Sequence, residues 1–148
     1  MSKRTFRRSV LLTAAVAATG IAGVATASPA SADRGSCYNR GNFSFVNDYG
    51  DGSWRKIDVY RGAGCSGKVI LAGRVSYAAA QGVIVLSASD AVCDSIGLTL
   101  YTQGPSVSST GCATTANKSA YLSAFPNPRT FWVRVNGTTN SDAVAFPL

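Results

Sequence analysis

The sequence contains no histidine and no glutamate, so its seven acidic side chains are all aspartates. The missing histidine excludes Ser-His-Asp and Cys-His nucleophile arrangements and zinc sites built on imidazole. The missing glutamate excludes Glu as a general acid or base. Catalysis would therefore need a pair of aspartates, or a serine or threonine activated by lysine. We expect a protein that is not an enzyme and that uses no cofactor.

Two pairs of aspartates are close enough in sequence to be considered as catalytic carboxylates: Asp48 with Asp51, and Asp90 with Asp94. Glycosidases can use two aspartates in this way, which leaves a small Asp-dependent hydrolase as one alternative function. Asp48 and Asp51 lie among Asn, Gly and Tyr residues, where aspartate commonly bonds its own backbone in a turn. They are also a weak calcium candidate, because the spacing of a calcium loop and its distal Glu are missing. We therefore predict no metal.

Clustered basic charge is also scarce once the start of the chain is set aside. The sequence carries 14 Lys and Arg residues against seven aspartates, a net charge of +7, but four of the basic residues lie within the first eight positions. The rest of the chain carries ten basic and seven acidic side chains, a net charge of +3, and Arg55-Lys56 is its one adjacent basic pair. A nucleic-acid-binding surface needs a clustered basic footprint, so we expect no nucleic-acid partner.

The basic start fits an export signal. An apolar stretch follows at residues 10–27, and Ala30-Ser31-Ala32 fits an A-x-A cleavage site. Threonine and glycine interrupt the apolar stretch, which argues against a membrane-spanning helix. We expect residues 1–32 to be a cleaved signal peptide and residues 33–148 to be a single secreted extracellular domain, without membrane contact after signal removal. Arg7-Arg8 also fits a twin-arginine signal, so the export route stays open.

Four cysteines remain after the signal. An even number in a small exported chain indicates two disulfides, and the absence of C-x-x-C spacing argues against a four-cysteine metal site. Three pairings are possible. We favour Cys37–Cys65 with Cys93–Cys112, because sequential pairing links neighbouring segments, although the sequence alone does not decide.

Helical periodicity is nearly absent, and only residues 76–81 fit a single helical turn. Alternating apolar and β-branched residues instead recur at short intervals between turn signals, which predicts an all-β fold, a small antiparallel β-sandwich or Greek-key barrel of about eight strands. The expected strands are residues 42–46, 54–61, 68–75, 82–87, 96–101, 120–125, 130–136 and 143–148. Residues 103–119 are expected to form a soft loop, and Asn136-Gly137 is a hairpin turn signal that places the last two strands side by side.

The segment 130–136 contains the first candidate binding surface. The strand period places its Phe and Val side chains on one face and Trp132 with Arg134 on the other. If the apolar face packs on the core, an indole and a guanidinium lie together in solvent, as a glycan or protein contact would need. Tyr101 is expected to point the same way from its own strand. The alternative is that Trp132 covers a neighbouring sheet edge, with the stem of Arg134 packed over it.

A proline-containing loop is the second candidate. Pro126 and Pro128 stiffen the segment that leads to Arg129. A rigid loop that displays an arginine is typical of protease inhibitors, in which preorganisation lowers the cost of binding. Proline is also common in ordinary connections between strands.

These residues predict a secreted, non-catalytic binding module that contacts an extracellular protein or a surface glycan. A protease inhibitor acting through Arg129 is the first alternative, and the Asp-dependent hydrolase is the second. The sequence leaves the ligand and the oligomeric state undetermined, and the surface around Trp132 is the feature to locate in the structure.

Overall fold

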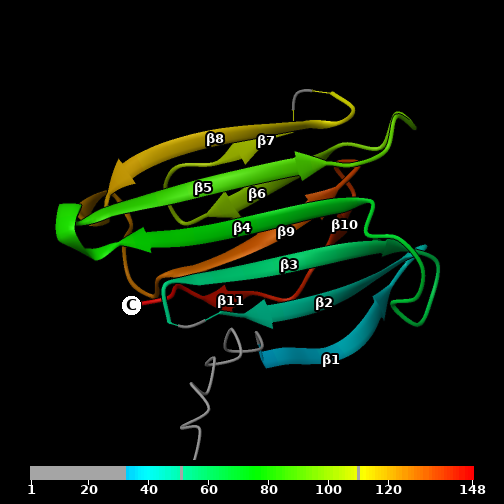
Figure 1. Cartoon of the computed structure of the whole chain (residues 1–148), viewed down its shortest axis with the longest axis horizontal. Helices are drawn as coiled ribbons and strands as arrows, with labels where there is room; N and C mark the ends of the chain where they lie inside the picture. The colour runs from blue at the N-terminus through cyan, green and yellow to red at the C-terminus, as the bar shows by residue number, and fades with distance from the viewer. Residues whose placement is uncertain (1–32, 51, 110) are drawn as a thin grey trace, which may run out of the picture.

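The computed structural model describes residues 33–50, 52–109 and 111–148, which form two antiparallel β-sheets (Figure 1). The predicted signal peptide at residues 1–32 and the candidate Asp51 lie outside the described residues. Within the described part of the chain, no helix has the length and apolar character that a membrane crossing requires.

The larger sheet has six strands in the order β1-β2-β3-β4-β5-β8, and it runs from the lower to the upper edge of Figure 1. The first five strands are consecutive antiparallel neighbours, so short turns suffice to connect most of them. β8 then joins the free edge of β5. The strands are β1 (Asp33–Arg40), β2 (Phe43–Tyr49), β3 (Trp54–Arg61), β4 (Leu71–Ala78), β5 (Val83–Asp90) and β8 (Thr114–Tyr121).

The smaller sheet has five strands, ordered β10-β9-β6-β7, with β11 also paired to β9. β9 is its centre, because β6 lies along one edge while β10 and β11 share the other. The strands are β6 (Leu98–Thr102), β7 (Val107–Ser108), β9 (Thr130–Val135), β10 (Thr139–Asn140) and β11 (Val144–Ala145). Two short 3-10 turns, η1 (Ala79–Gln81) and η2 (Leu122–Ala124), complete the regular structure.

The all-β prediction is confirmed, and the architecture is a two-sheet sandwich with eleven strands rather than about eight. The largest error concerns residues 103–119, which were expected to be a loop but contain β7 and most of β8. Their Ser, Thr and Asn side chains pair across the sheet, as Ser87 does with Asn117 at 2.6 Å and Ser89 with Thr115 at 3.0 Å. β8 is an edge strand whose residues are exposed or only half-buried, so it lacks the apolar alternation of a strand with one face on the core, and the hydrophobic pattern did not reveal it.

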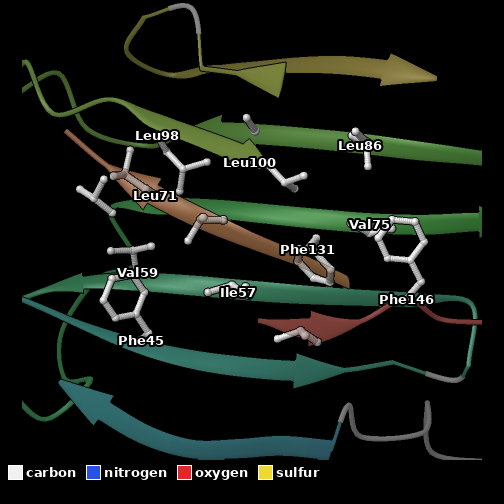
Figure 2. Packing of buried hydrophobic residues seen from close by; sticks show 14 of the residues in the cluster. Phe45, Ile57, Val59, Leu71, Val75, Leu86, Leu98, Leu100, Phe131 and Phe146 are labelled. Carbon is white, nitrogen blue, oxygen red and sulfur yellow. The ribbon is translucent and has the colours of Figure 1, made fainter. Parts of the chain in front are cut away.

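One hydrophobic core fills the space between the sheets (Figure 2). Every second residue of β5, β6 and β9 is buried, which is the pattern of strands with one face on a core. The sheets are in close contact at Gly73, where an added Cβ atom would lie 2.3 Å from Cγ1 of Val133. Gly73 therefore makes room for the valine of the opposite sheet.

Both disulfides form as predicted, Cys37–Cys65 and Cys93–Cys112. The first ties β1 to the connection between β3 and β4, and the second ties the β5–β6 connection to the β7–β8 connection. Two disulfides are compatible with an extracellular, oxidising environment.

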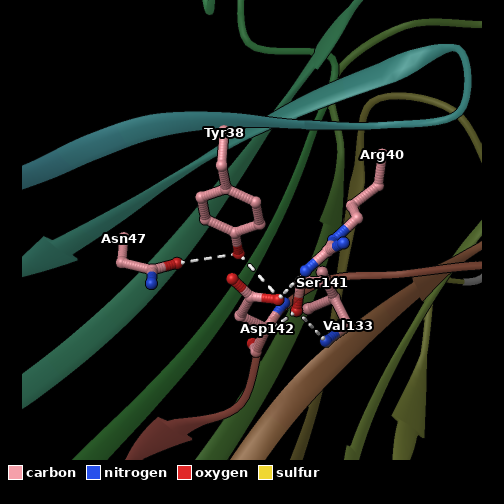
Figure 3. Close-up of polar contacts among 6 residues, drawn as sticks. All are labelled: Tyr38, Arg40, Asn47, Val133, Ser141 and Asp142. Carbon is pink, nitrogen blue, oxygen red and sulfur yellow. Dashed lines mark hydrogen bonds and ion pairs between the residues drawn. The ribbon is translucent and has the colours of Figure 1, made fainter.

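A polar cluster joins the β1 edge of the larger sheet to the end of the chain (Figure 3). The Tyr38 hydroxyl donates to Oδ1 of Asn47 at 3.2 Å and accepts the backbone N–H of Asp142 at 3.1 Å. Arg40 forms an ion pair with Asp142 at 2.7 Å. Ser141 accepts the backbone N–H of Val133 on β9 at 3.0 Å. The cluster therefore adds hydrogen bonds to the stacking of Tyr38 on Phe45 of the core at one side of the sandwich.

Candidate functional site

The structure brings the three predicted contact residues together on the outer surface of the smaller sheet. Trp132 and Arg134 alternate on β9 with buried neighbours, and Tyr101 lies directly opposite Trp132 on β6. The two rings are stacked, with centroids 5.8 Å apart and planes inclined by 14°. The guanidinium carbon of Arg134 lies 4.9 Å from the centre of the Tyr101 ring. We call these three half-buried residues the aromatic face.

Contacts within the sheet hold the aromatic face in place. Nε of Arg134 donates to Oδ1 of Asn140 on β10 at 2.8 Å, which fixes the guanidinium beside Tyr101. On the next strand pair, the hydroxyls of Thr99 and Ser108 are 2.8 Å apart. Arg134, Tyr101 and Trp132 thus form a continuous row across two strands whose side chains are already restrained.

The polar atoms of the two rings remain available. Among the described residues, neither the indole N–H of Trp132 nor the hydroxyl of Tyr101 has a hydrogen-bond partner, and neither residue has an interaction beyond those given above. In the same part of the chain, no buried side-chain nitrogen or oxygen lacks a partner. The two groups therefore face solvent, and the face offers apolar ring surface together with two uncommitted hydrogen-bonding groups.

A second tryptophan lies on the outer surface of the larger sheet, and the sequence analysis did not single it out. Arg74 lies over the Trp54 ring at 4.8 Å. The backbone of Gly50 contacts the same ring, because an added Cβ atom there would lie 2.2 Å from an indole carbon. Trp54 is thus packed against its own turn and covered by an arginine, which makes it a natural counterpart for comparison with Trp132.

The proline loop holds its arginine close to the protein. Pro126 and Pro128 are exposed and the Asn127–Pro128 peptide bond is cis, but Arg129 is half-buried. Nε of Arg129 donates to the backbone carbonyl of Phe125 at 3.3 Å, and Phe125 is buried in the core. The side chain is directed back to its own loop, whereas a reactive arginine of an inhibitor projects away from the protein.

The candidate Asp48 lies on β2 rather than in a turn, directly opposite Lys56 on β3, and its carboxyl group meets that of Asp58 on the same strand. Nζ of Lys56 lies 2.9 Å from Asp58 and 3.4 Å from Asp48, so the lysine bridges both carboxylates. Burial and, to a smaller extent, a hydrogen bond with Asp48 raise the pKa of Asp58, Lys56 opposes the rise, and the net result is a pKa of about 6. The sequence analysis missed Asp58 because the strand period alone does not indicate which polar residues are covered.

The other aspartate pair has local structural roles. Oδ1 of Asp90 accepts the backbone N–H of Val92, and Oδ1 of Asp94 accepts that of Ile96, both at 3.0 Å. Asp94 also forms an ion pair with Arg61. Across residues 33–50, 52–109 and 111–148, no group of three or more His, Cys, Asp or Glu side chains is placed to hold a metal ion. The carboxylates thus serve turns and ion pairs.

Comparisons with known proteins found no relative of this chain: no family model, no curated protein and no solved structure matches it. The site must therefore be interpreted from its own residues.

Proposed function

We propose that the protein is a secreted, non-catalytic binding module that contacts an extracellular protein or a surface glycan through the aromatic face of Tyr101, Trp132 and Arg134. The observation that carries this proposal is the stacked Tyr101–Trp132 pair, whose polar ring atoms have no partner in the described part of the chain. Tryptophan, tyrosine and arginine are the residues that most often dominate binding energy at interfaces.

Preorganisation supports the same proposal. Immobilising a flexible side chain on binding costs about 0.5–1.5 kcal/mol, and here Asn140 and the Tyr101 ring already restrain Arg134. The Trp132 ring is likewise restrained by its stacking on Tyr101. These side chains are already ordered in the folded protein, so ligand binding loses little further conformational entropy there.

The hydrogen bonds and ion pairs of the aspartates favour a binding function over a hydrolytic one. Asp90 and Asp94 accept backbone N–H groups in turns, and Asp48 and Asp58 share a lysine. A glycosidase needs two carboxyl groups facing a sugar across a cleft. The inhibitor alternative has less support, because Arg129 donates to its own loop.

The experiment compares two pairs of substitutions on opposite surfaces. Trp132→Ala with Arg134→Ala removes the aromatic face, and Trp54→Ala with Arg74→Ala removes the matched tryptophan–arginine pair of the larger sheet. Each variant is tested on a glycan array and on extracellular proteins captured by the native protein from culture medium. Loss of a central aromatic contact costs about 2 kcal/mol or more, a fall in affinity of about thirtyfold.

The expected result is that only the Trp132/Arg134 variant loses binding, while circular dichroism shows that both variants remain folded. Binding that persists undiminished in this variant would overturn the assignment of the aromatic face. Slower cleavage by a trypsin-like protease in the presence of the native protein would favour the inhibitor instead.

A further inference from the structure

We propose that a recess at one end of the sandwich is a second binding site, and that it takes a neutral saccharide. The recess lies between the β1–β2 turn of the larger sheet and the β9–β10 turn of the smaller one. It has a volume of about 460 Å³, within the range of ordinary small-ligand pockets. Asn42, Arg61, Asn136 and Thr139 provide its polar lining, and Phe43 and Ile96 its apolar lining. We call it the end recess.

The end recess lies at the end of the sandwich that carries the β1–β2, β3–β4, β5–β6, β7–β8 and β9–β10 connections, on the right in Figure 1. The Cys93–Cys112 disulfide fixes two of these connections to each other, and Cys65 fixes a third to β1. Four non-glycine residues with positive φ lie in these connections: Cys65, Ser95, Ala113 and Asn136. Such backbone conformations cost free energy and persist where the surroundings hold them, which is typical of loops that carry function.

The two turns that border the recess are fixed by backbone hydrogen bonds. The carbonyl of Asn42 accepts the N–H of Gly62 at 2.9 Å, and the N–H of Asn136 donates to the carbonyl of Gly97 at 2.9 Å. These bonds connect each turn to a neighbouring connection of the same end. The rim is therefore held without a ligand, and binding does not need to order it.

Unpaired amide groups at the rim indicate the chemistry of the ligand. Among the described residues, the exposed side chains of Asn42 and Asn136 make no hydrogen bonds within the protein. Each side-chain amide offers an acceptor and two donor hydrogens, and the Thr139 hydroxyl offers both functions. Sugar hydroxyls also donate and accept at once, so they can pair with every one of these groups.

The charge and the lining explain why the ligand is neutral. Arg61 forms an ion pair with Asp94, so its charge is already compensated at the edge of the recess. An anion would have to displace Asp94 from Arg61, and a cation would have to displace Arg61 from Asp94. Phe43 and Ile96 are half-buried and pack against the core, which provides an apolar surface for the C–H face of a sugar ring.

This site is separate from the aromatic face. Trp132 and Tyr101 lie on the outer surface of the smaller sheet, whereas the end recess is lined by residues of both sheets at one end of the sandwich. The proposal therefore goes beyond the function proposed above, and the two assignments can fail independently.

The test is an NMR titration of the ¹⁵N-labelled protein with maltose, cellobiose or N,N′-diacetylchitobiose at millimolar concentrations, with glucuronate and glucosamine as charged comparators. At least one neutral disaccharide is expected to give saturable shifts in the amide signals of Asn42, Asn136 and Thr139. Asn42→Ala and Thr139→Val should each weaken this binding by about tenfold, the loss of roughly one hydrogen bond. Asn117→Ala, which removes an exposed amide of β8 outside the recess, should leave the binding unchanged.

The assignment of the recess is overturned if no neutral probe shifts its signals, or if Asn42→Ala and Thr139→Val bind as the native protein does. Shifts confined to Tyr101 and Trp132 would also overturn it, while supporting the aromatic face. A recess that responds only to glucuronate or glucosamine would contradict the neutral ligand class.

Discussion

The contact between Gly73 and Val133 allows the packing of the two sheets to be tested by one added methyl group. A Cβ atom at Gly73 would lie 2.3 Å from Val133 Cγ1 and 3.3 Å from Leu100 Cδ1. Val133 and Leu100 are fully buried, so neither can move into solvent. Overpacking a core in this way costs about 1–3 kcal/mol, and the lower entropy of the unfolded alanine chain offsets about 0.4–1 kcal/mol. Gly73→Ala should therefore lower the free energy of unfolding by about 1–2 kcal/mol.

A second substitution separates this clash from other effects. Val133→Ala should cost about 2 kcal/mol on its own, because it leaves a cavity between the sheets. In the double variant the new methyl group at position 73 occupies part of that cavity. The double variant should therefore be more stable than the sum of the two single losses predicts, by about 1–2 kcal/mol.

Urea unfolding at equilibrium, followed by circular dichroism with the disulfides intact, measures these differences. Gly97→Ala is the control, because the nearest atom to its added Cβ is Ser109 Oγ at 3.8 Å. It should not lower stability, and the lower entropy of the unfolded chain should raise it by up to about 1 kcal/mol. If the losses from Gly73→Ala and Val133→Ala add within about 0.5 kcal/mol, the two residues do not share the space described. That result would refute the face-to-face packing of β4 on β9.

Three further changes test other contacts. The pKa of Asp58 is raised from 3.8 to about 6. Between pH 3.8 and about pH 6, the folded state therefore binds more protons than the unfolded chain. Stability should fall as the pH rises through this window, and Asp58→Asn should remove that slope; an unchanged slope in urea titrations would contradict it. Replacing both Cys93 and Cys112 with alanine opens a loop with a sequence separation of 19 residues and should lower the free energy of unfolding by roughly 3 kcal/mol, whereas an unchanged calorimetric melt would refute this. Tyr38→Phe deprives the Asp142 N–H of its acceptor and should cost about 1 kcal/mol, measured by urea unfolding, where no loss would show that the cluster does not stabilise the sandwich.

The sequence predicted the parts of the fold in which burial alternates along a strand. β9 is the best case, because its apolar residues at every second position face the core and leave Trp132 and Arg134 outside. The turn after it was also predictable, since Asn136 and Gly137 both have the positive φ that their hairpin turn requires. The disulfide pairing favoured from proximity in sequence is the one that the structure contains, although the sequence alone left three pairings open.

The sequence did not predict strands that are stabilised by polar pairing. β8 has mostly exposed residues and gains its place through hydrogen bonds to β5 such as Ser87–Asn117. Its Ser, Thr and Asn content is typical of loops, and only the neighbouring strand makes it extended. β1 was missed for a related reason, because its side chains are mostly exposed and Tyr38 meets Asp142 from the far end of the chain.

The candidate sites, like the strands, were predicted only in part from the sequence. The position of Trp132 opposite Tyr101 depends on which strands are neighbours, which the sequence period does not specify. The end recess depends on loops from both sheets and had no signal in the linear sequence. Asp48 was recognised, but its partner proved to be Asp58 on the adjacent strand.

Tryptophan fluorescence tests the central claim most directly, because the sequence contains only two tryptophans and they lie on opposite surfaces. Trp54→Phe leaves Trp132 as the single indole, and Trp132→Phe leaves Trp54. Each variant is titrated with the glycan or protein that the native protein captures. The emission of Trp132 should shift and saturate with the ligand, while that of Trp54 stays constant. A response from Trp54 alone, or an unchanged Trp132 signal at saturating ligand, would contradict binding through the aromatic face.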